Sequence, residues 1–435
     1  MDDPQQVAAL IAQVWAAQTT GEIEVSYVNS EEIFSATRQP APQCDVFIYP
    51  ATTIGELIAR EFIQPLEMAQ LNDLGADRRL LLRHDRSTCV QFGKSIYGAS
   101  LGSPMLMLLY RKDVFEKMKL DVPQTWQQYR ATLEALQSSA TKWNSENADQ
   151  IPTQACEPTA GTWLAENLLA RAAGSVVRQG RLSSYFEIES LKPLINTPPF
   201  VDALEQLVAE RPFKAEKPMT PEECYVAIVQ GEAALAVTWP SSHSIVDGPS
   251  ETLPIAVAQI PGALRSFDYR DQKWKTISPD EIRATPLVPL TGRVASIAKE
   301  SRRLRTALRF EAWLMTADAN REFSSQAADL LFTQSSQLTD PYRWVNDQLP
   351  REAAQQMADV LRAYHDHPMV LNNLRIPGRA AYMQILADAA RSAIDGQSTP
   401  QAALDAAAAR WEELSEKLGR DQQRKLFQDS IRLEF

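Results

Sequence analysis

Aromatic and polar side chains that suit the binding of a polyhydroxylated ring are spread along the 435-residue chain. The C–H faces of a sugar ring are apolar and stack on aromatic rings, whereas its hydroxyls need hydrogen-bond donors and acceptors. Trp239 precedes Pro240, which prevents simple continuation of a strand, so its ring is expected at a strand end. The side chains singled out are the aromatics Tyr49, Trp163, Trp239 and Tyr382 and the polar residues Thr52, Glu157 and Ser241. Each aromatic has an alternative place in the hydrophobic core, and Glu157, just before Pro158, has one as a solvated loop carboxylate.

Catalytic and metal-binding patterns are weaker. The stretch His365–His367 holds two histidines at a spacing that points their rings apart on a predicted helix, so we expect a solvated face and no metal site. The stretch 241–243 (Ser-Ser-His) lacks the glycines of a nucleophile elbow, and the sequence has no glycine-rich phosphate loop. Paired carboxylates such as Glu157 and Asp45 leave a glycan-processing hydrolase as an alternative. We therefore expect a protein that is not an enzyme and that uses no metal or cofactor.

Length and charge narrow the class of protein. Hydrophobic cores stop growing near about 250–300 residues, so a chain of 435 residues predicts two lobes. A net charge of −11 without any Lys/Arg-rich stretch argues against a nucleic-acid partner. No stretch approaches the roughly 18 apolar residues of a membrane span. The acidic start, Met1–Pro4, shows no secretory signal.

The cysteines give no metal or redox motif. Cys44, Cys89, Cys156 and Cys224 are widely spaced and form no CxxC pair, which disfavours a zinc site. Buried free thiols and two disulfides both remain open from the spacing alone.

Helix-start signals and hydrophobic periodicity alternate along the chain. Capping boxes are predicted at Thr53, Thr125 and Thr220, and Thr399 begins a helix that Gly419 ends. Periodicity predicts strands over 23–27, 45–49 (of the buried parallel type), 105–110, 233–239, 255–259 and 294–297, and helices at the start of the chain, over 304–314 and over 404–418. The polar stretch 263–284 is expected to be a surface insertion. This order predicts an α/β fold with mixed sheets flanked by helices.

Five stretches carry a family resemblance that covers nearly the whole chain. They are Asp45–Tyr49 with Ile54–Leu66, Ile96–Phe115 with Pro123–Trp126, Gln230–Ala236 with Trp239-Pro240, Ile376–Gly378 with Tyr382, and Thr399–Leu404. Their order resembles that of the family 1 extracellular solute-binding proteins of ABC importers, the maltose-binding-protein-like type. The resemblance implies a two-lobed, type II periplasmic-binding-protein-like fold. Lobe 1 would comprise 1–110 and 255–301, and lobe 2 would comprise 111–254 and 302–435.

The same resemblance implies a non-catalytic receptor. A monomeric, periplasmic or extracytoplasmic protein would capture a small molecule, expected to be a carbohydrate, by hinge closure. It would deliver this solute to an ABC-type membrane permease. A peptide, polyamine or opine remains an alternative solute, because specificity lies in loop detail.

Ligands of open α/β sheets bind beyond the carboxyl ends of the strands. The loops expected there are 49–53, 99–104, 157–163, 239–242 and 375–382. Positions that match the family are Tyr49, Ala51, Thr52, Glu157, Thr159, Trp239, Ser241 and Tyr382, and the loops add Ser103 and Trp163. Closure is expected about hinges near 110–113, 253–257 and 300–303.

Overall fold

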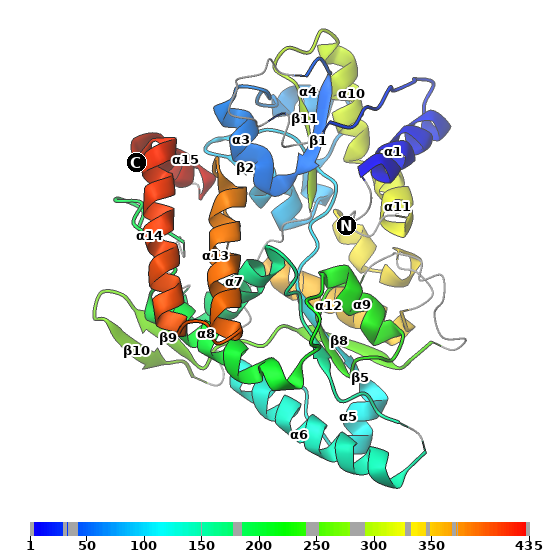
Figure 1. Ribbon diagram of the computed structural model, residues 1–435. Helices are drawn as coiled ribbons and strands as arrows, with labels where there is room; N and C mark the ends of the chain where they lie inside the picture. The colour runs from blue at the N-terminus through cyan, green and yellow to red at the C-terminus, as the bar shows by residue number, and fades with distance from the viewer. Residues whose placement is uncertain are drawn as a thin grey trace.

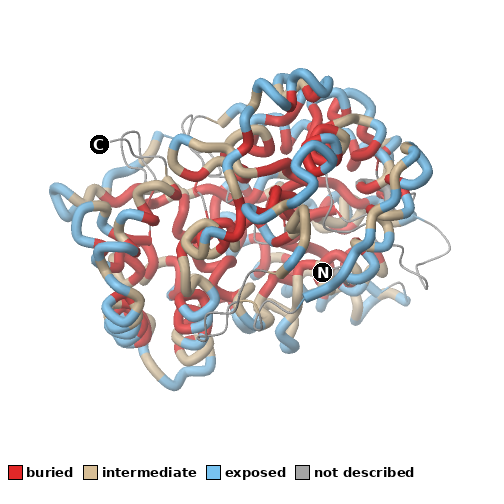
Figure 2. Tube along the Cα trace, turned by 90° about the horizontal axis from the view of Figure 1, so that it is seen from above, coloured by how far each residue is buried: buried red, intermediate tan, exposed pale blue. Residues whose placement is uncertain are grey.

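Two lobes, each built on its own β-sheet, make up the structure, which is a computed structural model (Figure 1). It describes residues 4–28, 33, 42–148, 150–176, 185–240, 252–278, 292–326, 332–344, 349–367, 371 and 373–431. Buried segments gather in the interior of the molecule and exposed ones on its outside (Figure 2). None of the helices within these ranges is long and apolar enough to cross a membrane.

The first sheet has the strand order β1-β11-β4. Its strands are β1 (Val46–Pro50), β4 (Ala99–Ser100) and β11 (Arg293–Ile297). This confirms the strands predicted over 45–49 and 294–297. The expectation that the former is of the parallel type is wrong, because β1 pairs antiparallel with β11 along its whole length. A short hairpin, β2 (Gln91–Phe92) with β3 (Ser95–Ile96), lies in the same lobe.

Helices cover the first sheet and close a core around Trp15. These are α1 (Pro4–Gln18), α3 (Ile54–Ala59), α4 (Met68–Asp73), α10 (Leu304–Leu314) and α11 (Ala317–Gln326). The ring of Trp15 packs edge-on against Phe310 and Trp313, at centroid distances of 5.3 and 5.0 Å. The strand predicted over 23–27 is wrong. That segment has no regular structure, and Val25 and Tyr27 are 42% and 54% exposed.

The second sheet has the order β6-β7-β5-β8. Its strands are β5 (Met107–Arg111), β6 (Ala155–Cys156), β7 (Leu235–Thr238) and β8 (Ile255–Gln259). The central strand β5 pairs antiparallel with both β7 and β8, while β6 and β7 are parallel. The apolar runs that predicted strands over 105–110, 233–239 and 255–259 therefore meet in one sheet.

Helices surround this second sheet. They are α5 (Lys112–Met118), α6 (Trp126–Glu146), α7 (Trp163–Val176), α8 (Pro198–Glu210), α9 (Pro221–Val229) and α12 (Arg351–Asp366), and a hairpin of β9 (Arg265–Asp268) and β10 (Lys273–Thr276) projects beside them. The hairpin occupies part of the insertion predicted over 263–284, whose end lies outside the described residues. Short helical turns connect the elements of both lobes. They are η1 (Ala51–Thr53), η2 (Arg78–Leu80), η3 (His84–Thr88), η4 (Arg211–Phe213), η6 (Ser335–Leu338) and η7 (Pro341–Trp344).

Helix starts follow the predicted caps in three of four cases. Thr125 and Thr220 each form a complete capping box, and Thr399 accepts a hydrogen bond from the N–H of Ala402. Thr53 makes no side-chain cap, because it is the last residue of the helical turn η1 and its backbone is already helical. The capping box predicted at Thr53 is therefore wrong.

The lobe boundaries predicted from the sequence remain a proposal, which the strand pairing modifies. The predicted boundaries place both 107–110 and 255–259 in lobe 1, yet they pair within the second sheet. They place helices α10 and α11 in lobe 2, yet α10 packs on β11 and α11 packs on α1. The chain therefore passes between the sheets just before β5 and just after β8, rather than inside the ranges 110–113 and 253–257.

Three helices at the end of the chain complete the structure: α13 (Arg379–Ile394), α14 (Pro400–Leu418) and α15 (Arg420–Ser430). The first two stand side by side (Figure 1), and α13 packs on α7. Phe186 joins them, with its ring 5.1 Å from Trp411 and 5.3 Å from Phe427. Helix α15 reaches the first lobe, where the carbonyl of Asp429 accepts a hydrogen bond from Gly93.

All four cysteines are free thiols, and three of them are buried. The structure thus favours the free-thiol alternative over two disulfides.

Candidate functional site

Most of the predicted ligand-contact residues follow the carboxyl ends of parallel-running strands. In the first sheet β1 and β4 run in the same direction, because both are antiparallel to β11. Ala51 and Thr52 follow β1, and Ser103 follows β4. In the second sheet β6 and β7 are parallel, and the turn that leads to Trp163 follows β6 while Trp239 follows β7. Each sheet therefore presents its candidates at one edge.

Trp163 and Trp239 form the aromatic pair of the second lobe. Their ring centroids are 5.8 Å apart, with an interplanar angle of 51°. Trp239 is 6% exposed, and Trp163, at the start of α7, is partly exposed. Sequence spacing did not predict this contact between residues from two different strand ends.

The candidates of the first lobe are buried as well. The Tyr49 hydroxyl shares a hydrogen bond of 2.7 Å with Ser296 Oγ, and burial raises the pKa of this phenol well above its usual range. Thr52 and Ser103 are each 6% exposed. Ser103 Oγ lies 2.8 Å from the Sγ of Cys89. Their side chains lie mostly within the lobe.

Glu157 belongs to a buried ion network. Burial alone would raise the pKa of its carboxyl, yet Arg171 and Lys214 hold it well below the ordinary value. Arg171 Nη2 and Lys214 Nζ lie 2.6 and 2.8 Å from Glu157 Oε1, and Asn167 donates to Oε2 at 2.7 Å. Arg171 also pairs with Glu210, and both side chains are fully buried. These partners favour a structural role for Glu157.

Three predicted residues remain, and each has a different outcome. Tyr382 is fully buried in α13, where its hydroxyl bonds Ser415 Oγ at 2.8 Å and burial raises its pKa to about 12. The main chain of Thr159 donates to the carbonyl of Met219 and accepts from Arg391, and its Oγ1 accepts from the N–H of Met219. Ser241 lies outside the described residues.

Sequence reasoning missed a polar cluster next to Trp163. Glu166, one turn further along α7, accepts from Asn373 Nδ2 at 2.7 Å and pairs with Arg379 at 3.0 Å. Burial raises the pKa of Glu166 to about 7, against the opposing effect of Arg379. The available signal was the single carboxylate of a largely apolar helix, α7. Arg379 also directly follows the Ile376–Gly378 motif.

The lobes touch through the segment that leads into α13. The main-chain N–H of Gly378 donates to Glu56 Oε2 at 3.2 Å, and Arg375 Nη1 donates to the carbonyl of Thr88 at 2.7 Å. Gly55 lies against the same segment, since a Cβ on it would stand 1.9 Å from the carbonyl oxygen of Arg375. A side chain at Gly55 would force this contact apart.

The expectation of a solvated histidine pair at 365–367 is wrong for His365. Its side chain is buried, and its ring centroid lies 4.7 Å from that of His84. The part of the chain that the structure describes contains no group of three or more His, Cys, Asp or Glu residues placed to hold a metal ion.

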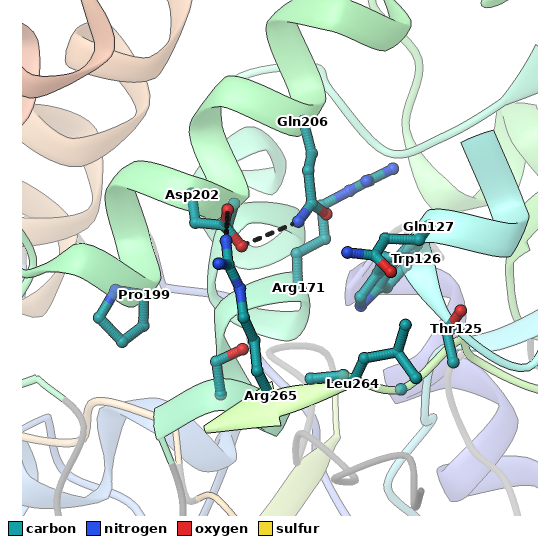
Figure 3. A pocket seen from close by; sticks show the side chains of 13 residues that line it. Thr125, Trp126, Gln127, Arg171, Pro199, Asp202, Gln206, Leu264 and Arg265 are labelled. Atoms are coloured by element: carbon teal, nitrogen blue, oxygen red, sulfur yellow. Dashed lines mark hydrogen bonds and ion pairs between the residues drawn. The ribbon is translucent and has the colours of Figure 1, made fainter. Parts of the chain in front are cut away.

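A small cavity opens within the second lobe, beside Arg265 and Gln206 (Figure 3). Asp202 accepts hydrogen bonds from both of these side chains. The volume of the cavity is about 20 Å³, which suits a water molecule rather than a sugar. Arg171 and Ser175 of α7 line the cavity, but neither Trp163 nor Trp239 does.

Solved structures share this fold over almost the whole chain. Maltose-bound MalE3 of T. maritima matches with a TM-score of 0.69 and 18% identity, covering 94% of this chain and 96% of that one. The sugar-binding protein MalE of Xanthomonas citri matches with a TM-score of 0.69 and 15% identity, covering 97% and 98%. A solute-binding protein of Agrobacterium radiobacter K84 in complex with ribitol matches with a TM-score of 0.64 and 19% identity, covering 95% and 96%.

The family model described as bacterial extracellular solute-binding protein matches residues 9–350. This match spans both sheets and most of the helices that surround them. The chain belongs to the bacterial extracellular solute-binding proteins.

Proposed function

We propose that this protein captures a carbohydrate or polyol between its two lobes and delivers it to an ABC-type permease. The observation that carries the proposal is the pair Trp163 and Trp239, which meet at one edge of the second sheet. Paired aromatic faces suit the apolar C–H faces of a sugar ring. The family match supplies the receptor role.

The charges around this pair favour a neutral solute. Glu157 is neutralised by Arg171 and Lys214, and Glu166 is paired with Arg379. A cationic polyamine would need unpaired carboxylates, and a phosphorylated solute would need unpaired cations. Similar structures support the same class of solute, since they were solved with maltose, D-mannitol and ribitol.

We assign the contacts by their position at the strand ends. Trp163 and Trp239 stack on the solute from the second lobe, and Thr52 faces it from the first. The remaining contacts come from Ala51, Ser103, Thr159 and Ser241. Tyr49, Glu157 and Tyr382 shape the walls of the site through internal hydrogen bonds rather than through direct contact.

Closure of the lobes would trap the solute. The chain passes between the sheets before β5 and after β8, and such crossings offer few packing contacts that resist rotation. A solute that touches both lobes binds the closed form better, and only this difference in affinity shifts the equilibrium. The closed form is then the signal that a permease reads outside the cytoplasm. The receptor acts as a monomer.

A hydrolase is the less supported alternative. Its predicted carboxylates lie in different lobes: Asp45 accepts from Ser301 Oγ beside the first sheet, while Glu157 sits in the buried ion network of the second. The Glu157 carboxylate is occupied by its ion pairs, so it is not available as an acid or base for a glycosidic bond.

A thermal-shift screen tests the proposal directly. Neutral saccharides and polyols form one panel; amino acids, peptides and polyamines form the other. A solute at 100 times its Kd adds about 2.7 kcal/mol to the stability of the folded state. Stabilisation by the second panel alone would overturn the carbohydrate assignment. Mass spectrometry of the recovered sugar distinguishes binding from cleavage.

A further inference from the structure

Two buried imidazoles meet where the lobes join. His84 begins the turn η3 of the first lobe and is 1% exposed, and His365 lies in the last turn of α12 of the second lobe and is 5% exposed. Their ring centroids are 4.7 Å apart with an interplanar angle of 36°. The turn η3 is a π-type helix, a rare local structure that is frequent at functional sites.

The hydrogen bonds of these rings fix the protonation of His365. Its Nδ1 accepts from the main-chain N–H of His84 at 3.3 Å, so that nitrogen carries no proton. His84 Nε2 lies 3.2 Å from the carbonyl oxygen of Tyr364 and therefore donates to it. A proton added to His365 Nδ1 would make this nitrogen a donor. It would then face the main-chain N–H of His84, which is also a donor, and the hydrogen bond would be lost.

The same helix end holds the crossing segments. The Tyr364 hydroxyl accepts from the N–H of Ile260, just after β8, and donates to the carbonyl of Leu106, just before β5. One residue of α12 thus contacts both crossings, while the next contacts the first lobe through His84. A change at His365 therefore acts where the second lobe contacts the first, next to both crossings.

The charged groups next to the pair do not compensate a positive charge on His365. Arg83 precedes His84, and its Nη1 bonds the carbonyl of His367 at 3.5 Å. Asp85 turns away, because it accepts from Ser100 Oγ at 2.6 Å within the first lobe. Asp366, the next residue of α12, is exposed. Burial, His84 and Arg83 all lower the pKa of His365 well below its ordinary value.

We propose that the contact between His84 and His365 is a proton-sensitive latch, and that acidification shifts the protein away from the lobe arrangement in which the two rings meet. The proposal rests on the lobe motion proposed above. It does not depend on which solute is bound.

The sign follows from the two states of His365. In the packed state its pKa is depressed, so the ring stays neutral; once the lobes separate, the ring regains an ordinary pKa near 6.5. The packed arrangement is favoured above about pH 6.5 and is lost progressively below it. Because one proton is taken up, the ratio of separated to packed molecules rises by up to about tenfold per pH unit below that point. Asp85, whose own pKa burial raises to about 7, titrates inside the first lobe and does not face the latch.

Interlobe distances measured without solute test the latch. Spin labels are attached at Asp73→Cys on α4 and Lys142→Cys on α6, two exposed positions on different lobes. Cys44→Ser removes the one native cysteine that is not buried. We expect the distance distribution to shift between pH 7.5 and 5.5, in proportion to the population change above. An Asn at position 365 places its Oδ1 where His365 Nδ1 now accepts and cannot be protonated, so His365→Asn should abolish the shift.

Two further variants complete the test. His367→Asn lies on the same helix end outside the latch and should shift like the parent protein. His365→Gln repeats the non-titrating substitution if the Asn variant folds poorly. A parent protein with the same distances at both pH values overturns the latch, as does an equal shift in the His365 variants. Neither result bears on solute binding, which the thermal-shift screen measures separately.

Discussion

The hydroxyl of Tyr364 accepts a hydrogen bond from the main-chain N–H of Ile260, with 3.0 Å between the two atoms. The same hydroxyl donates to the carbonyl of Leu106 at 3.1 Å. One phenol therefore satisfies a donor and an acceptor on the two segments that link the sheets. Burial raises the pKa of Tyr364 well above its usual range, so it remains a donor at all relevant pH values.

Removing this hydroxyl should destabilise the protein. In Tyr364→Phe the ring still fills its place, but Ile260 N and Leu106 O lose a buried partner, which costs about 1–3 kcal/mol. Urea unfolding at pH 7.5 measures the loss. Tyr27→Phe is the matched control, because Tyr27 is 54% exposed and should change stability little. Equal stability of the two variants would show that Tyr364 does not hold the crossings.

Trp239 should contribute to affinity more than to the core. If its ring stacks on solute, Trp239→Ala weakens binding by more than about 1 kcal/mol, roughly a fivefold rise in Kd. Calorimetry with a solute identified in the screen gives the value. Trp274→Ala on the hairpin of β9 and β10 is the control and should bind normally. Unchanged affinity with a large fall in Tm would instead place Trp239 among the packing residues.

Local signals predicted local structure well. The capping boxes at Thr125 and Thr220 depend on contacts within four residues, and both formed as predicted. The prediction failed at Thr53 because this residue already belongs to the helical turn η1. Apolar runs predicted most strands, but their pairing is decided by residues far apart in the chain. Alternation at Ile23–Tyr27 therefore produced no strand, since no described strand pairs with it.

The candidate site was less predictable for the same reason. The sequence identified Trp163 and Trp239 as candidates, but their contact depends on the parallel pairing of β6 with β7. Glu157 was expected to face solute or solvent, because nothing near it in the sequence shows that Lys214 would lie beside it. His365 looked solvated on its own helix. Its ring in fact packs against that of His84 in the other lobe.

Neutralising Glu157 should weaken the second lobe at neutral pH. Glu157→Gln leaves Arg171 and Lys214 buried with one carboxylate between them, and breaking a buried pair costs about 3–5 kcal/mol. The folded pKa of Glu157 is depressed below its unfolded value of 4.5, so the stability it contributes is present above that pH and is lost as pH falls through the folded pKa.

Unfolding curves at pH 7 and pH 3 measure both effects. The gap between parent and Glu157→Gln should be large at pH 7 and smaller at pH 3. Glu134→Gln, which breaks an exposed pair with Arg130, should cost at most about 1 kcal/mol. A gap that does not narrow in acid would assign the loss to packing rather than to charge.

Asp85 should have the opposite dependence on pH. Its carboxyl is buried, with a pKa raised by burial to about 7, and Ser100 Oγ donates to it at 2.6 Å. The folded state therefore holds a proton that the unfolded state releases near pH 3.8, so ionisation of Asp85 destabilises the fold as pH rises from 3.8 through 7. Each unit of pKa difference corresponds to about 1.4 kcal/mol. Asp85→Asn keeps an acceptor for Ser100 and cannot ionise.

We expect Asp85→Asn to match the parent protein near pH 4 and to exceed its unfolding free energy at pH 8, by at most a few kcal/mol. The difference between the two proteins across pH isolates this carboxyl from every other titrating group. Asp73→Asn, at an exposed position on α4, should show no such difference. A variant less stable than the parent at pH 8 would mean that the ionised carboxylate is stabilised in the fold, and the pKa of Asp85 would then lie below rather than above its ordinary value.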